Sequence, residues 1–279
     1  MSKYFFFDVD GTLLPFGKSV PESAVYAIKA AQALGSKCFI ASGRSLAELP
    51  AFENIAFDGY ICSAGATIEI DGKRIYSAHI ERKKFNKLFR YLKDRGFYVL
   101  TQTDNATYLS REAGEFFKSQ LMKYIGRLVE LNGLVLSEDV PEGEEIKKLL
   151  ILCAEDGYGT DRVRAEIGSE FTVVNNTVSL PPRLMVEIVM SSVSKATGIE
   201  KVLSYYGASR EDSVAIGDGS NDIEMVEYAS LGIAMGNSSS DLLEVADYVT
   251  TDVENDGIKN AIFYALSGGA YDGRNKKEG

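Results

Sequence analysis

The sequence has few of the residues on which many enzyme mechanisms depend. In 279 residues it holds one histidine, His79, and three cysteines, Cys38, Cys62 and Cys153. A single histidine excludes zinc sites built from several imidazoles and leaves only His79 for a Ser-His-Asp or Cys-His mechanism. No carboxylate or serine motif surrounds His79, so we expect it to be structural or at the surface. Catalysis in this chain therefore has to rest mainly on carboxylates, lysine and the backbone.

Other absences bear on where the chain resides. The cysteines lie far apart without a CxxC pair, and a sparse, odd number of them is typical of a reducing compartment. No apolar run approaches the roughly 20 residues that span a bilayer. The chain enters an apolar run at Tyr4 without the basic and long apolar regions of a signal peptide. We expect a cytoplasmic protein.

Acidic residues outnumber basic ones, and the formal net charge is −10. A surface of this sign repels nucleic acid and anionic membranes, so neither is an expected partner. It would repel a phosphorylated metabolite as well. A phosphate site in this chain must therefore supply its own positive charge from a metal, a lysine or helix N-termini.

Two separate stretches of the chain alternate strand and helix patterns. The first includes a helix that Pro21 opens and Gly35 closes, and the second includes a helix over 194–206. This alternation predicts an α/β fold with a doubly wound, mainly parallel sheet, formed by residues 1–81 and 188–279. The predicted strands of this sheet are 4–9, 37–41, 59–62, 213–216, 231–235 and 248–250.

The middle of the chain has a different pattern. Residues 82–187 are more charged, with long amphipathic helices over 83–95 and 112–131 and alternating strand patterns such as 97–102 and 171–174. We expect these residues to form an α+β domain inserted between the two halves of the α/β domain.

Residues able to carry chemistry gather at one edge of the predicted sheet. Asp8 to Thr12 ends the first strand, Ser42 to Arg44 ends the second, and Asp218 to Asp222 follows the strand at 213–216. Lys195 begins the helix that leads to that strand. Ligands of open parallel sheets bind at this edge. A single carboxylate there could be a plain helix cap, but several repel one another unless a cation lies among them.

An oxygen-rich site without histidine or cysteine favours magnesium. Asp8 is ionised at neutral pH and can attack phosphorus without a base. Gly11 allows a turn that brings Asp10 beside the site, where it can protonate the leaving oxygen and later activate water. Lys195, the Ser42 hydroxyl and nearby backbone N–H groups can neutralise the transferred phosphoryl group. The pattern predicts phosphoryl transfer.

Together these residues resemble the haloacid dehalogenase superfamily of aspartate-nucleophile phosphatases, in particular the Cof-like hydrolases with a type IIB cap. Asp8 to Thr12 matches the DxDGT signature, and Ser42 and Lys195 match the second and third signatures. The fourth is Gly217 to Asp222, and Ala234 to Asn237 matches the strand that follows it. All four signatures occur in the right order over the whole chain.

The resemblance implies a role for each residue. Asp8 is the nucleophile and Asp10 the general acid and base. Mg²⁺ is held by Asp8, the backbone carbonyl of Asp10 and Asp218. Asp222 orients Lys195 or a metal-bound water and Thr12 is structural in the turn, although either side chain could equally be a local cap. The residues implied to contact the phosphate are Ser42, Gly43, Lys195 and Asn221.

The resemblance also implies that the insertion is a cap that closes over the site and contacts the leaving group. A covered cleft favours a small phosphorylated metabolite. Sugar phosphates are the usual substrates in this family, with nucleotide, flavin mononucleotide and pyridoxal phosphate also among them. The candidate contacts are Tyr108, Arg111, Tyr124 and Arg183 in the cap, with Arg44 in the core.

One segment departs from the family pattern. Relatives usually have Ser-Asn-Gly-Ala after the third strand, where this chain has Ser63-Ala64-Gly65-Ala66. The missing Asn side chain would lie near the entrance of the cleft. The departure therefore bears on substrate preference rather than on catalysis.

Two other functions stay open at this point. A phosphomutase of the phosphomannomutase type shares this core and cap, but it returns the phosphoryl group to a sugar and needs a bisphosphate activator. A binding protein on the same fold would usually have lost Asp8 or Asp10, and both are present. We predict a Mg²⁺-dependent phosphatase that acts through an aspartyl-phosphate on Asp8.

Overall fold

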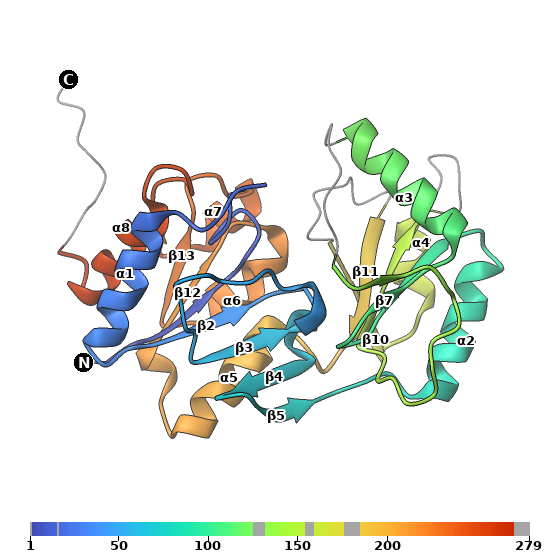
Figure 1. Ribbon diagram of the computed structural model, residues 1–279, viewed down its shortest axis with the longest axis horizontal. Coiled ribbons are helices and arrows are strands. Elements are labelled where there is room, and N and C mark those ends of the chain that lie inside the picture. The colour runs from blue at the N-terminus through green and yellow to red at the C-terminus, as the bar shows by residue number, and fades with distance from the viewer. Residues whose placement is uncertain (1, 16, 125–131, 154–158, 176–184, 271–279) are drawn as a thin grey trace.

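The computed structural model describes residues 2–15, 17–124, 132–153, 159–175 and 185–270. Their strands form an eight-stranded and a six-stranded sheet. Figure 1 shows the N-terminal and C-terminal segments together on one side and the middle of the chain on the other. We call the part built around the eight-stranded sheet the core and the part built around the six-stranded sheet the cap.

The core sheet has the order β14-β13-β12-β1-β2-β3-β4-β5. Neighbouring strands from β14 to β3 run parallel, and β4 and β5 are antiparallel additions at one edge. This confirms the predicted doubly wound, mainly parallel sheet. The strands are β1 (Tyr4–Phe7), β2 (Lys37–Ala41), β3 (Gly59–Cys62), β4 (Thr67–Ile70), β5 (Lys73–Ser77), β12 (Ser213–Gly217), β13 (Leu231–Ala234) and β14 (Tyr248–Val249).

Helices cover both faces of the core sheet because its central strands are apolar on both sides. In β1, Phe5 and Phe7 point to the face covered by α1 (Glu22–Ala33) and α8 (Gly257–Leu266). Phe6 points to the opposite face, covered by α5 (Lys195–Tyr206), α6 (Ile223–Tyr228) and α7 (Ser240–Val245). The alternation holds β1 between two apolar layers and fixes the position of its carboxyl end.

The cap sheet has the order β10-β11-β9-β6-β7-β8, with only the β7–β8 pair parallel. The strand β11 continues to Met190, so the boundary expected at 187 falls inside a strand of this sheet. The strands are β6 (Tyr98–Gln102), β7 (Thr107–Tyr108), β8 (Leu134–Val135), β9 (Lys148–Leu152), β10 (Phe171–Asn175) and β11 (Met185–Met190).

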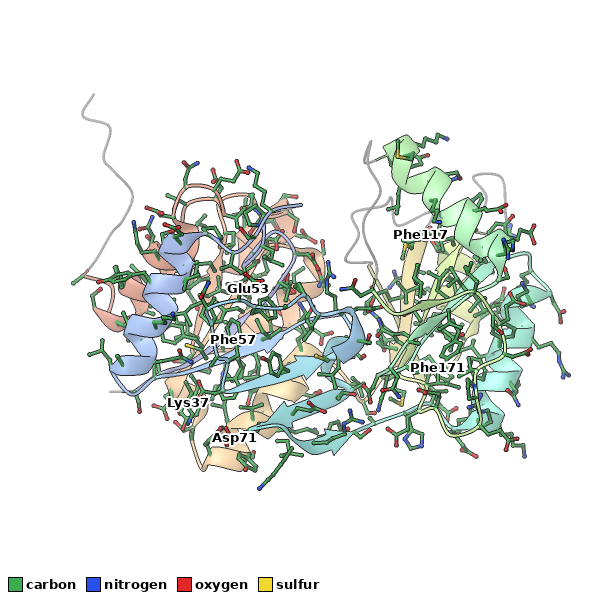
Figure 2. All side chains as sticks on the ribbon, in the orientation of Figure 1. Lys37, Glu53, Phe57, Asp71, Phe117 and Phe171 are labelled. Carbon is green, nitrogen blue, oxygen red and sulfur yellow. The ribbon has the colours of Figure 1, made fainter. Side chains whose placement is uncertain are left out.

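The cap helices pack on opposite faces of this sheet. The helices α2 (Arg82–Lys93) and α4 (Thr160–Glu166) cover one face, and α3 (Arg111–Tyr124) covers part of the other. Figure 2 labels Phe117, which packs from α3 onto the sheet, and Phe57, which is buried in the core. The helix predicted over 112–131 is thus present to Tyr124, and 125–131 lie outside the described residues.

Neither the three cysteines nor the single histidine lies in surroundings that would make its side chain reactive. The thiols of Cys38, Cys62 and Cys153 are buried, and burial raises the pKa of each. His79 is half exposed, with its Nδ1 3.5 Å from Glu145. In the described part of the chain, no helix has both the length and the apolar character needed to cross a bilayer.

Candidate active site at the carboxyl edge of the core sheet

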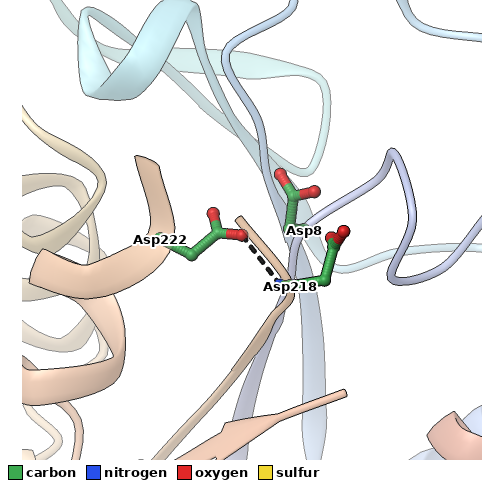
Figure 3. A group of neighbouring side chains, drawn as sticks. All are labelled: Asp8, Asp218 and Asp222. Carbon is green, nitrogen blue, oxygen red and sulfur yellow. Dashed lines mark hydrogen bonds between the residues drawn. The ribbon is translucent and has the colours of Figure 1, made fainter. Parts of the chain in front are cut away.

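Three carboxylates meet where β1 and β12 end. Asp8 follows β1, and its N–H donates to Ile216 O at 3.0 Å, so the hydrogen bonds between the parallel strands continue to Asp8. Asp218 follows β12, and Asp222 ends the short 3₁₀ helix η4 (Ser220–Asp222). One oxygen of each of these three aspartates lies within 4.8 Å of the others. Figure 3 shows their side chains converging from the two strand ends and η4.

Lys195 lies among these carboxylates. It is the first residue of α5, held there by the N-cap Ser194, whose Oγ accepts the Thr197 N–H. The buried Lys195 Nζ donates to Asp8 Oδ1 at 2.5 Å and to Asp222 Oδ1. Burial disfavours the ammonium, but the charges of Asp222 and Asp8 outweigh it and raise the pKa of Lys195. The lysine therefore stays charged next to Asp8.

Asp222 is fully engaged in hydrogen bonds. Its Oδ2 accepts the N–H groups of Asp218 and Gly219, each at 3.0 Å, and its Oδ1 accepts from Lys195. Figure 3 marks the bond to the Asp218 backbone. A carboxylate with both oxygens occupied in this way holds the turn after β12 and positions the lysine.

The turn after Asp8 is pinned at several points. Thr12 Oγ1 donates to Asp218 Oδ1 at 2.7 Å, and Asn237 Nδ2 donates to Gly11 O at 2.8 Å. Gly11 has a φ of +87°, and a Cβ there would lie 2.2 Å from Asp218 Oδ2. Only glycine fits this position, because any side chain would both strain the backbone and collide with the carboxylate.

Asp10 does not join the three carboxylates but pairs with Arg44. Arg44 Nε and Nη2 donate to the two carboxylate oxygens of Asp10, each at 2.7 Å, and Nη1 donates to Glu48 O. Burial opposes the guanidinium charge, but the hydrogen bonds with Asp10 raise the pKa of Arg44. Arg44, a candidate substrate contact, thus makes a two-pronged ion pair with Asp10 in this structure.

The predicted phosphate contacts lie beside a pocket between core and cap. Gly43, Lys195 and Asn221 line this pocket, whose volume is about 420 Å³. Ser42 is buried next to Gly43, with its Oγ accepting the Arg44 N–H at 3.2 Å. Ala64 also lines the pocket, in a left-handed conformation with φ +57° and ψ +29°. The position at which relatives usually have Asn, and this chain has Ala64, therefore faces the pocket.

The charges of this site favour a bound cation. Burial, followed by the charge of Asp222, raises the pKa of Asp8 well above its ordinary value. The same causes raise the pKa of Asp218 to about 7. All donors in the group are carboxylate oxygens, which are the ligands that Mg²⁺ prefers, and a divalent ion would relieve their repulsion. The residues present thus fit magnesium.

Three of the cap contacts expected from residue type do not line this pocket. Tyr108 is buried in β7, Arg111 begins α3, and the Tyr124 ring lies 5.0 Å from Lys123 Nζ at the end of that helix. Arg183 lies outside the described residues. The described cap residues that do line the pocket come mainly from β10 and β11, and they include Thr172, Val174, Glu187 and Val189. The sequence feature that could have pointed to this strand is Glu187, a charged residue inside the apolar run MVEIVM.

Comparison with known proteins agrees with this geometry. The model of the haloacid dehalogenase-like hydrolase family matches residues 5–262. The putative phosphatase YkrA of Bacillus subtilis is 30% identical over 269 residues, which cover 94% of this chain and 96% of that protein. This chain belongs to the haloacid dehalogenase-like hydrolases. The resemblance inferred from the four signatures is confirmed.

Solved structures of this superfamily share the fold over nearly the whole chain. The phosphatase BT1666 from Bacteroides thetaiotaomicron has a TM-score of 0.80 and 28% identity, covering 95% of each chain. The subclass IIB sugar phosphatase BT4131 has a TM-score of 0.79 and 26% identity, covering 95% of this chain and 99% of that one. The haloacid dehalogenase-like hydrolase described here is accordingly a phosphoric monoester hydrolase with the predicted type of cap.

Proposed function

We propose that this hydrolase is a Mg²⁺-dependent phosphatase that releases inorganic phosphate from small phosphorylated metabolites, sugar phosphates above all. The observation that carries the proposal is the position of Asp8. It lies at a strand end, hydrogen-bonded to the buried Lys195, with Asp218 and Asp222 beside it and a pocket adjoining. The sugar phosphatase activity named for the neighbour BT4131 supports the substrate class.

In the first half-reaction, an Asp8 carboxylate oxygen attacks phosphorus and forms an aspartyl-phosphate. The bond from phosphorus to the leaving oxygen breaks, and that oxygen takes a proton from Asp10. In the second half-reaction, Asp10 removes a proton from water, whose oxygen attacks phosphorus and releases phosphate and Asp8. Because both Asp10 oxygens are bound to Arg44 in this structure, Asp10 must leave Arg44 before it can donate a proton.

The remaining residues stabilise the transferred group. Lys195, Ser42 and Asn221 donate hydrogen bonds to phosphoryl oxygens, and the Lys195 charge offsets the net acidity of the protein. The position of Lys195 and Asn221 in the wall of the pocket supports these two contacts. Mg²⁺ would be held by Asp8, Asp218 and the backbone carbonyl of Asp10, and it would supply further positive charge to the phosphate.

Phosphate release from p-nitrophenyl phosphate and glucose 6-phosphate tests the proposal. We expect Asp8→Asn to lower kcat at least about 10⁴-fold, because the nucleophile is lost. The control Asp139→Asn, at an exposed cap position, should keep full activity. Activity should disappear with EDTA and return with MgCl₂.

Three results would argue against it. Equal activity of Asp8→Asn and wild type would refute the nucleophile, and activity in EDTA would refute the metal dependence. Transfer of the phosphoryl group between sugar positions, dependent on a sugar bisphosphate, would identify a phosphomutase instead.

A further inference from the structure

One face of the cap sheet is directed at the core. Gln102 shows this directly, because its Oε1 accepts the Ser63 hydroxyl at 2.9 Å and its Nε2 donates to Glu48 at 2.6 Å. In the sheet register Gln102 lies opposite Lys148, so both side chains share that face. Lys148 and Leu150 are two residues apart on β9, and Leu150 lies opposite Glu187 of β11. Gln102, Lys148 and Glu187 therefore all face the core.

Lys148 and Glu187 form an ion pair within this face. The distance from Lys148 Nζ to Glu187 Oε2 is 2.5 Å, and the two side chains are 1% and 2% exposed. Their neighbours along both strands are apolar, in the runs KLLIL and MVEIVM. Removing two charges from water costs several kcal/mol per ion, and an apolar pair at such positions is often at least as stable. Stability of the cap sheet alone therefore does not account for the pair.

The hydrogen-bonding capacity of the pair is also incompletely used. Glu187 Oε1 is buried and has no hydrogen-bond partner. A buried carboxylate oxygen without a partner costs about 1–3 kcal/mol or more, so such atoms are rare unless a ligand completes them. Glu187 lines the same pocket as Gly43, Lys195 and Asn221. The unpartnered acceptor thus belongs to a side chain at the wall of the space next to the phosphate-binding residues, although the oxygen itself is buried.

This arrangement gives the pocket two chemically different ends. At the core end, Lys195 and Asn221 offer donors to a phosphate. At the cap end, Glu187 Oε1 can only accept, and Glu187 is paired with Lys148, which does not itself line the pocket. The pair is neutral overall, so the pair itself offers little attraction to a second phosphate or a carboxylate. Among the described residues of the cap, the cation that lines the pocket is Arg164, whose Nη1 donates to Val173 O. Hydroxyl groups, which both donate and accept, match the pair best.

We propose that the Lys148–Glu187 pair determines leaving-group specificity and selects polyhydroxylated leaving groups, with a substrate hydroxyl donating to Glu187 Oε1. The inference rests on the proposed function, because it assigns the leaving group of that reaction. A sugar and an open-chain polyol present the same hydroxyl chemistry to the pair. An amino group would also be attracted to Glu187, and the experiment separates that case.

The test compares kcat/KM for glucose 6-phosphate with kcat/KM for p-nitrophenyl phosphate, whose leaving group has no further hydroxyl. In Lys148→Met/Glu187→Met, which replaces the pair by apolar side chains of similar length, this ratio should fall about 100-fold. In Glu187→Gln, whose amide oxygen is a weaker acceptor, the ratio should fall about 10-fold. The matched control is Glu170→Gln, since Glu170 pairs with Lys84 on the cap surface. It should leave the ratio as in wild type.

Three outcomes would overturn the inference. The first is a ratio of the two kcat/KM values that stays within about twofold of wild type in the double variant. If circular dichroism shows that the double variant does not fold, the same criterion applies to Glu187→Gln. The second is a larger loss for ethanolamine phosphate than for glucose 6-phosphate in Glu187→Gln, which would assign Glu187 to an amino group. The third is a wild type that releases phosphate from neither substrate, which would overturn the proposed function as well.

Discussion

Arg44 binds both carboxylate oxygens of Asp10, with Nε and Nη2 each 2.7 Å from an oxygen. The pair joins the turn after β1 to the residues after β2, and both side chains are largely buried. A carboxylate held this way is fixed in orientation, and the guanidinium occupies both of its oxygens. The proposed catalytic cycle therefore includes the separation of Asp10 from Arg44 before the leaving oxygen is protonated.

The first prediction concerns Asp10. Asp10→Asn should keep the contact with Arg44 through its amide oxygen but lose proton transfer, so kcat for glucose 6-phosphate should fall about 10²- to 10⁴-fold. Arg44→Lys keeps the charge without the two-pronged contact and should cost about tenfold or less. Steady-state phosphate release measures both. A loss below tenfold in Asp10→Asn would remove Asp10 from the acid and base role.

The second prediction concerns Lys195. Lys195→Met leaves Asp8 and Asp222 buried without their cation. We expect the free energy of unfolding to fall by about 3–5 kcal/mol, as for other buried ion pairs that lose one partner. We also expect kcat/KM to fall at least about 100-fold. Lys201→Met serves as the control on the same helix, where the lysine lies over the Tyr76 ring. Urea unfolding that gives equal stability for the two variants would contradict the burial argument.

The third prediction links magnesium to pH. Burial and the charge of Asp222 raise the pKa of Asp218 to about 7 from 3.8. A raised carboxyl pKa means that ionising Asp218 destabilises the metal-free fold, increasingly as pH rises from about 4 to about 7 and fully above it. Mg²⁺ relieves that repulsion, so MgCl₂ should raise Tm more near pH 8 than near pH 5.

Thermal unfolding in EDTA and in MgCl₂ at the two pH values measures this difference. Asp218→Asn should lose most of the magnesium-dependent rise because a ligand is absent. An equal rise at both pH values would show that Asp218 is already ionised near pH 5 and that its pKa is not raised.

The fourth prediction concerns the contact between cap and core. The buried Glu48, which ends the 3₁₀ helix η1 (Leu46–Glu48), accepts from Thr107 Oγ1 at 2.5 Å and from Gln102 Nε2 at 2.6 Å. Glu48→Ala leaves these donors buried and unpaired, so stability should fall by about 1–3 kcal/mol. Amide exchange in β6 and β7 should become faster. Glu69→Ala, which removes only the pair with Arg74, should leave that exchange unchanged.

The fifth prediction concerns Ala64. Its φ of +57° is a left-handed conformation that costs a residue with a Cβ about 1–2 kcal/mol, and asparagine tolerates it better than alanine. Ala64→Asn should therefore raise the free energy of unfolding by about 1 kcal/mol, whereas Ala64→Val should lower it. Urea denaturation distinguishes the two. A less stable Ala64→Asn variant would mean that the space around Ala64 excludes the longer side chain.

Much of the core could be predicted because its signals are local. Short apolar strands such as β1 and the glycine turn at Gly11 are visible in the sequence, and the carboxyl edge follows from parallel pairing. The helix α8 was not predicted, although Ile258, Ala261, Ile262 and Ala265 have helical spacing and are buried against the sheet.

What could not be predicted depends on contacts between distant segments. Nothing in the sequence says that Arg44 binds Asp10 rather than a substrate, because that choice depends on how the turn after β1 packs against the residues after β2. Lys148 and Glu187 are 39 positions apart and share a face only through the register of β9 and β11. Among the side chains chosen from the cap, Tyr108, Arg111 and Tyr124 lie elsewhere, because β10 and β11 rather than α3 line the pocket.

The strands of the cap sheet form one uninterrupted stretch of the chain, between the end of β5 at Ser77 and the start of α5 at Lys195. Asp8, Ser42 and Asp218 all lie outside that stretch, and Glu187 lies inside it. The residues proposed to transfer the phosphoryl group and the residue proposed to select the leaving group are thus encoded by different segments of the gene. Replacing a single internal segment would give an enzyme a new substrate while its reaction stayed the same. Recombination could supply such a change in one step.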